Sequence, residues 1–111
     1  MYCSNDETPL IVVNENIKRK ILSHQGGLMT VEVHFSGQTD NPYLHSHPHE
    51  QIVYVLEGIF EFQKNGEKFR MIPGDTAYFE PNVEHGSVLA DGRTEGKLLD
   101  IFTPQREDFL K

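Results

Sequence analysis

Hydrophobic and polar residues alternate along several short segments of this chain, with the two-residue period that is typical of β-strands. The clearest case is segment 29–35, in which Met29, Val31, Val33 and Phe35 alternate with polar residues. We find no long segment with the 3.6-residue period of an amphipathic helix. The pattern therefore predicts strands that bury one face each.

Turn-forming residues separate these segments. Asn65-Gly66 is the strongest short hairpin signal in the chain and joins predicted strands at 59–63 and 67–72. Pro73-Gly74-Asp75 predicts a second tight turn, and residues 37–42 a loop. Further strands are expected at 51–57, 76–80, 84–89 and 97–103, with one helical turn within 105–110. Many short strands with frequent turns predict an all-β fold, which we expect to be a small antiparallel barrel.

Composition supports the all-β prediction. Isoleucine, valine and threonine total 21 residues and aromatics 11, against only 2 alanines, a mixture that favours strands. The length of 111 residues fits one domain. Residues 1–16 are weakly patterned, and we expect an N-terminal arm or an edge strand there, followed by the barrel domain at 17–111. A small barrel with strand edges and such an arm is expected to form a homodimer.

Charge narrows the classes of partner. The formal net charge is −7, and no run of Lys or Arg is longer than the three residues at 18–20, which argues against binding to nucleic acid or to a membrane surface. The apolar runs are too short to span a bilayer. A single cysteine, Cys3, cannot form an internal disulfide, and the polar, acidic N-terminus does not resemble a signal peptide. A soluble cytoplasmic protein is expected.

Three of the six histidines stand two residues apart, at positions 45, 47 and 49. His45 and His47 point to one face of an extended segment, which makes them half of a site for a divalent metal. Gln51 would lie about 13 Å from His47 on a straight strand, so the chain must bend, and Pro48 stands where the bend is needed. His85 opens a later strand and can supply another ligand from a neighbouring strand.

Other interpretations of these histidines remain open at this point. His49 shares the parity of His45 and His47, and it competes with them as a ligand. The run at 45–49 also fits a solvated loop or a weak, adventitious metal binder. His24 and His34 are isolated, and we assign them to ordinary surface or core positions.

Residues 45–51, His-Ser-His-Pro-His-Glu-Gln, are followed by six residues and Gly58, and this segment resembles the first motif of the cupins. The turn at 73–75, Pro81 and His85 resemble the second cupin motif. The resemblance implies a single-domain jelly-roll β-barrel and places His49 outside the ligand set. It also implies one divalent transition metal (Ni, Zn, Mn, Fe or Cu) held by His45, His47, Gln51 and His85.

Gln51 departs from the commonest cupin pattern, in which a glutamate stands at this position. Because an amide is neutral, three histidines and Gln51 leave a divalent ion with its full charge. That charge favours a Lewis-acid role and the binding of an anionic substrate oxygen. It weakens the case for a dioxygenase.

The last predicted strand carries a carboxylate that alternation places inside the barrel. Leu98, Asp100 and Phe102 share one face, and Arg106 follows shortly after. A carboxylate in an apolar interior is costly unless it is paired or functional, and a guanidinium can hold a carboxylate through two hydrogen bonds. Two alternatives remain open: a register shift of one residue turns Asp100 to solvent, or Arg106 pairs with Glu107 or Asp108 on the surface.

The segment 100–109 resembles the ending of the small cupins of pectin and alginate breakdown, the KdgF type, which also share the histidine segment. This resemblance implies a metal-dependent enzyme that converts cyclic 4,5-unsaturated monouronates to linear ketonised sugars, so the partner would be a small anionic sugar or a similar metabolite. By the same resemblance, Asp100 would move a proton, Arg106 would hold the substrate carboxylate and Phe102 would shape the pocket.

Two other functions compete with this one. One is a different metal cupin, such as a dioxygenase or a sugar isomerase, which iron dependence and oxygen consumption would reveal. The other is a non-catalytic domain that binds a small metabolite, for which ligand-dependent stabilisation without turnover is expected.

Overall fold

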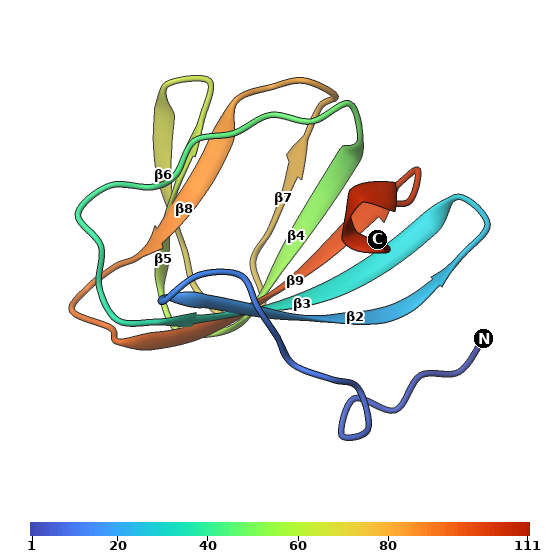
Figure 1. The fold of residues 1–111 in the computed structure, drawn as a ribbon. Helices are drawn as coiled ribbons and strands as arrows, with labels where there is room; N and C mark the ends of the chain where they lie inside the picture. The colour runs from blue at the N-terminus through green and yellow to red at the C-terminus, as the bar shows by residue number, and fades with distance from the viewer.

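The computed structural model describes all 111 residues. It contains nine β-strands and one short 3-10 helix (Figure 1). The helix η1 (Glu107–Phe109) follows the last strand and lies beside it. The strands are β1 (Ile11–Val12), β2 (Ile17–Gln25), β3 (Leu28–Ser36), β4 (Glu50–Glu57), β5 (Phe60–Lys64), β6 (Glu67–Met71), β7 (Thr76–Phe79), β8 (His85–Leu89) and β9 (Glu95–Thr103).

The strands form two antiparallel sheets that face each other. The larger sheet has the order β1-β2-β3-β9-β4-β7, and the smaller has the order β6-β5-β8. The main core lies between them and takes residues from both, including Val53 and Leu98 from the larger sheet and Phe60 and Phe62 from the smaller. The all-β prediction is confirmed. We predicted a closed barrel, whereas the structure shows two sheets with separate hydrogen-bond ladders.

Local sequence accounts for most of these elements. Asn65 and Gly66 both have positive φ, 49° and 84°, as a two-residue hairpin turn requires, and they join β5 to β6 with Lys64 opposite Glu67. The predicted strands after residue 28 lie close to the observed ones. Strand β2 was not predicted, because consecutive charged residues at 18–20 hide its alternation and a register shift interrupts it between Ile21 and His24.

Strand β9 sits at the centre of the larger sheet, between β3 and β4. Leu98 is 3% exposed and Phe102 is 2% exposed, so this face points into the interior. Asp100 lies between them and opposite Val31 and Val53. The predicted inward orientation of Asp100 is therefore correct, and the alternative of a one-residue shift is wrong.

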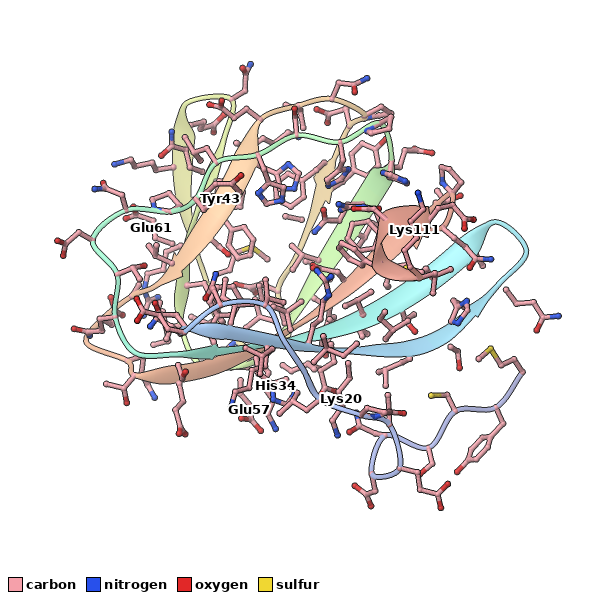
Figure 2. The ribbon with its side chains drawn as sticks, in the orientation of Figure 1. Lys20, His34, Tyr43, Glu57, Glu61 and Lys111 are labelled. Atoms are coloured by element: carbon pink, nitrogen blue, oxygen red, sulfur yellow. The ribbon has the colours of Figure 1, made fainter.

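The N-terminal segment lies against the outer face of the larger sheet. The Asn5 side chain donates a hydrogen bond to Glu32 (2.8 Å), and Lys20 donates to the Asn5 carbonyl (2.8 Å). Figure 2 shows Lys20 and His34 on this outer face, away from the interior between the sheets. Within residues 1–16, β1 is a two-residue edge strand paired with β2. The domain boundary at residue 16 stays a prediction. No helix has the length and apolar character needed to cross a membrane.

Gly58 ends β4 in a conformation that only glycine adopts without strain. Its φ is +84°, and a Cβ there would lie 2.8 Å from the carbonyl oxygen of Glu95. We expect Gly58→Ala to destabilise the protein by more than about 3 kcal/mol, because a left-handed conformation costs roughly 1–2 kcal/mol and the clash adds to this. Urea denaturation measures the difference.

The matched control for this prediction is Gly74→Ala. Gly74 has φ +95°, and a Cβ there would have no atom within 4 Å. Only the conformational cost applies, so about 1–2 kcal/mol should be lost. Equal losses in the two variants would contradict the role of the contact between Gly58 and β9.

Candidate metal centre

A pair of backbone hydrogen bonds brings two histidines from distant parts of the chain side by side. The amide of His45 donates to the carbonyl of His85 (3.0 Å), and the amide of His85 donates to the carbonyl of His45 (2.9 Å). This antiparallel bridge attaches the segment before β4 to the start of β8. The two imidazole rings lie 4.6 Å apart.

Gly86 allows this close approach. A Cβ at Gly86 would lie 2.5 Å from the carbonyl oxygen of Tyr43, a distance that would force the two segments apart. The absence of a side chain at Gly86 therefore lets the segment that carries His45 lie directly on β8.

His47 and Gln51 meet because the chain turns between them, as predicted around Pro48. The Nε2 atom of His47 lies 3.0 Å from Oε1 of Gln51, and Nε2 of His85 lies 3.1 Å from the same oxygen. The ligand atoms of His45, His47 and His85 all lie within 4.8 Å of one another. The structure thus brings together the four residues that the sequence predicted.

Hydrogen bonds to the backbone select the tautomer of each histidine. The Nδ1 atoms of His45, His47 and His85 face the carbonyl oxygens of Tyr43 (3.3 Å), His49 (3.1 Å) and Val83 (3.0 Å), respectively. A carbonyl only accepts, so each Nδ1 carries the proton and donates. Each Nε2 therefore has a free lone pair, the arrangement found in metal-binding histidines.

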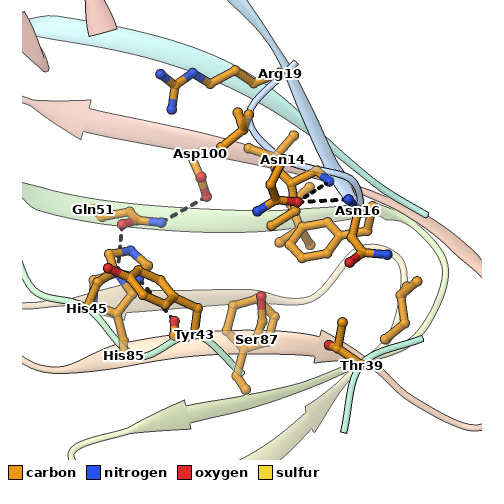
Figure 3. A pocket seen from close by; sticks show the side chains of 18 of the residues that line it. Asn14, Asn16, Arg19, Thr39, Tyr43, His45, Gln51, His85, Ser87 and Asp100 are labelled. Atoms are coloured by element: carbon orange, nitrogen blue, oxygen red, sulfur yellow. Dashed lines mark hydrogen bonds between the residues drawn. The ribbon is translucent and has the colours of Figure 1, made fainter. Parts of the chain in front are cut away.

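The Gln51 amide also has one orientation. Its Nε2 donates to Oδ1 of Asp100 at 2.8 Å, so its oxygen points at the histidines (Figure 3). An oxygen lone pair then faces the Nε2 lone pairs of His47 and His85 with no proton between them. Converging acceptors repel each other unless a cation lies among them, so the residues present fit a bound divalent metal.

The histidines of the cluster favour the neutral form, and His47 and His85 are buried, whereas His45 is only partly so. Burial lowers the pKa of His85 to about 4, and the proximity of His45 and His47, which would repel a charge on His85, lowers it further. Burial also lowers the pKa of His45 and of His47 below the ordinary histidine value. Three neutral imidazoles and an amide leave the charge of a divalent ion uncancelled, as the sequence analysis expects of Gln51.

Asp100 lies directly behind Gln51 on the cavity wall. Burial raises the pKa of Asp100 to about 7, while the hydrogen bond from Gln51 and the positive charge of Arg106 oppose this rise. A glutamate at position 51 could not donate to Asp100 unless it were protonated. The requirement for a donor at this point explains why an amide suits this position.

Phe102 and Arg106 complete this side of the site. The ring of Phe102 packs edge-on against His47, with centroids 5.5 Å apart, and the Arg106 guanidinium lies 5.1 Å from the Phe102 ring centroid. Arg106 also donates two hydrogen bonds to Asp108, at 3.1 and 2.9 Å. The Asp108 pair considered in the sequence analysis is therefore present, although the Arg106 side chain is only 12% exposed and lines the cavity.

The remaining histidines lie outside the cluster. His24 bonds to the side chain of Gln105 (2.9 Å), and His34 pairs with Glu32 on the outer face of the sheet (2.6 Å). The ring of His49 packs against Phe102, and its contribution to the cluster is the backbone carbonyl that orients His47.

A cavity of about 270 Å³ opens beside the cluster, between the two sheets (Figure 3). Its size suits a small molecule. His47 does not line it, whereas the other predicted site residues do: His45, Gln51, His85, Asp100, Phe102 and Arg106. Sequence reasoning missed seven polar residues that line it: Asn14, Asn16, Arg19, Thr39, Asn41, Tyr43 and Ser87. For Arg19 there was a usable signal, since it shares the parity of Ile17 and Ile21 on one strand face.

Comparisons with known proteins support the cupin resemblance seen in the sequence. Residues 28–102 match the family model described as a cupin domain. The chain is 41% identical over 111 residues to the pectin degradation protein KdgF of Dickeya dadantii, covering 98% of this chain and 97% of that protein.

Solved structures give the same result. KdgF from a Halomonas species superimposes with a TM-score of 0.90 at 34% identity, covering 98% of this chain and 97% of that one. An RmlC-like cupin from Shewanella frigidimarina superimposes with a TM-score of 0.88 at 33% identity, covering 97% and 94%.

The donor set leads to a prediction about metal content. We expect the purified protein to hold one divalent ion per chain, and His85→Ala to lose most of it, because neither Gln51 nor the other histidines can replace the missing lone pair. A chelator should lower the melting temperature of the wild type by more than about 5 °C, since a ligand at 100 times its Kd stabilises by about 2.7 kcal/mol. Elemental analysis and thermal unfolding measure both effects.

His24→Ala provides the matched control, because His24 is a histidine outside the cluster. It should keep the wild-type metal content and the wild-type response to chelator. If His24→Ala loses as much metal as His85→Ala, the ion is bound somewhere other than at the cluster.

Proposed function

Since the chain belongs to the cupin family, we propose that it is a metal-dependent enzyme that converts cyclic 4,5-unsaturated monouronates to linear ketonised sugars. The relative at 41% identity, covered almost completely, is a pectin degradation protein. The observation that carries the proposal is the Gln51 amide, which joins a cluster of converging lone pairs to a buried carboxyl on the wall of one cavity.

In this proposal His45, His47, Gln51 and His85 hold the ion. When bound, a divalent metal with neutral ligands supplies Lewis acidity to an oxygen of the sugar. The donor set suits Ni, Zn, Mn, Fe or Cu. It lacks the carboxylate of the two-histidine, one-carboxylate arrangement of iron oxygenases, which favours the Lewis-acid function over a dioxygenase.

Asp100 is the proposed acid and base. Ring opening breaks the bond between C1 and the ring oxygen, and the hydroxyl on C1 loses its proton as the aldehyde forms. The enolate left at C4, C5 and the former ring oxygen becomes a ketone at C5 when C4 gains a proton. The two transfers balance, so one carboxyl that accepts the first proton and delivers the second is sufficient, and no other reactant is consumed.

Arg106 and Phe102 are proposed to bind and shape the substrate. Phe102 presents its ring to the cavity next to His47, where it can pack against a sugar ring. The family resemblance gives Arg106 the substrate carboxylate, but Arg106 lies over Phe102 and already binds Asp108. We therefore assign its charge to the stabilisation of the enolate.

Turnover of an unsaturated uronate tests the proposal. We expect purified, metal-loaded protein to accelerate the loss of the ultraviolet absorbance of the enol, and a chelator to abolish this acceleration. Asp100→Asn should lower kcat by about 10²–10⁴-fold, the usual contribution of one acid–base group. The variant amide still accepts the hydrogen bond from Gln51, so metal content should not change.

Asp91→Asn makes the same chemical change at an exposed carboxylate that pairs with Arg70. It should leave kcat unchanged. Full activity in Asp100→Asn would show that Asp100 does not move the proton. Ligand-dependent stabilisation without turnover in the wild type would instead favour a non-catalytic binding domain.

A homodimer is part of the same proposal, together with a jelly-roll barrel architecture and a cytoplasmic location. Leu10, Ile11, Val12 and Val13 are all more than 40% exposed, and β1 is the edge strand of the larger sheet. A second copy of the chain that covers this edge would remove from water both these apolar side chains and the edge strand β1. We expect light scattering to give twice the chain mass of 12.7 kDa, and a mass of one chain would contradict the dimer.

A further inference from the structure

A second arginine faces the cavity in addition to Arg106. Arg19 lies on β2 and lines the cavity together with Ile17, which shares its strand face. Figure 3 shows its guanidinium beyond Asp100, on the side of that carboxyl away from Gln51 and the histidines. The polar groups of the cavity thus run from the metal ligands through Asp100 to Arg19.

The two arginines differ in their partners. Arg106 already uses two of its hydrogen-bond donors on the carboxylate of Asp108. Arg19 forms no ion pair, and its buried Nε has no hydrogen-bond partner. A buried donor without a partner is costly, so a group that pairs with Arg19 gains more than one that must compete with Asp108.

Aromatic packing holds Arg19 in place. Its guanidinium carbon lies 3.7 Å from the centroid of Phe109, and that of Arg106 lies 4.2 Å from the same centroid. Two like charges are therefore kept close together on one ring. Burial and the charge of Arg106 lower the pKa of Arg19, whereas Asp108 opposes this effect. Since Asp108 is the only carboxylate bonded to this pair, one positive charge is left for an incoming anion.

We propose that Arg19 binds the carboxylate of the substrate and thereby makes the cavity select uronates over neutral sugars. This assignment rests on the proposed function and adds a residue to it. A carboxylate on C5 that is held by Arg19 places the neighbouring C4 next to Asp100, where the proton is delivered. A planar guanidinium with free donors can bind that carboxylate through two parallel hydrogen bonds.

Steady-state kinetics with the unsaturated uronate test the proposal first. Arg19→Gln should raise KM by about 30-fold or more, because a hydrogen bond between charged groups is lost, while kcat falls much less. Arg19→Lys keeps the charge without the planar pair of donors and should give an intermediate KM. Circular dichroism and thermal unfolding establish that both variants fold.

Lys18→Gln is the matched control. Lys18 precedes Arg19 on the same strand, points to the opposite face and does not line this cavity. The variant loses the same charge, so it corrects for any effect of net charge on an anionic substrate. Its KM should equal that of the wild type.

Binding without turnover separates this proposal from the proposed function. Calorimetry measures binding of glucuronate, which lacks the 4,5 double bond, and of glucose. The wild type should bind glucuronate more tightly than glucose. Arg19→Gln should lose this preference and keep the wild-type affinity for glucose. A structural defect would weaken the binding of both sugars equally. Loss of the preference supports the assignment even if the wild type turns over no uronate, in which case only the proposed function fails.

Three results would overturn the assignment. The first is turnover by the wild type with the same KM in Arg19→Gln, which would leave the proposed function intact. The second is the absence of any preference for glucuronate over glucose in the wild type. The third is a KM increase of the same size in Lys18→Gln, since the effect would then come from general charge.

Discussion

The orientation of one side-chain amide connects the two halves of the site. Gln51 donates to Asp100 and therefore turns its oxygen toward His47 and His85. Rotation of the amide by 180° would place its oxygen against the carboxyl and its NH₂ group against lone pairs that bind a cation. The candidate metal site and the Asp100 carboxyl are thus linked by a single neutral group, which keeps them in contact without adding charge.

Much of the candidate site could be predicted from alternation and spacing. Parity alone placed His45 and His47 together and Asp100 inside, because strand side chains alternate strictly and β9 is regular. Parity could not exclude His49, since it has the same spacing. What distinguishes His49 is the turn after His47, which depends on backbone contacts such as that between Asn82 and the His47 carbonyl (2.7 Å).

The parts that could not be predicted depend on contacts between distant segments. The bridge between His45 and His85 pairs residues forty positions apart, and no local pattern encodes such a pairing. Arg19 was missed because Lys18 and Lys20 surround it with charge, so that the run appears to be a solvated surface. Its inward orientation follows from the pairing of β2 with β3, which sets the register of the whole strand.

Gly86 has a consequence for how relatives of this chain are identified. Gly86 is not a candidate metal ligand. It matters because a side chain at this position would clash with the backbone at Tyr43. A sequence can therefore keep all four ligands and still lose the cluster if a larger residue follows the last histidine. Searches for metal-binding members that score only the ligands will include such chains, whereas requiring a glycine at this position adds a steric criterion that ligand spacing does not contain.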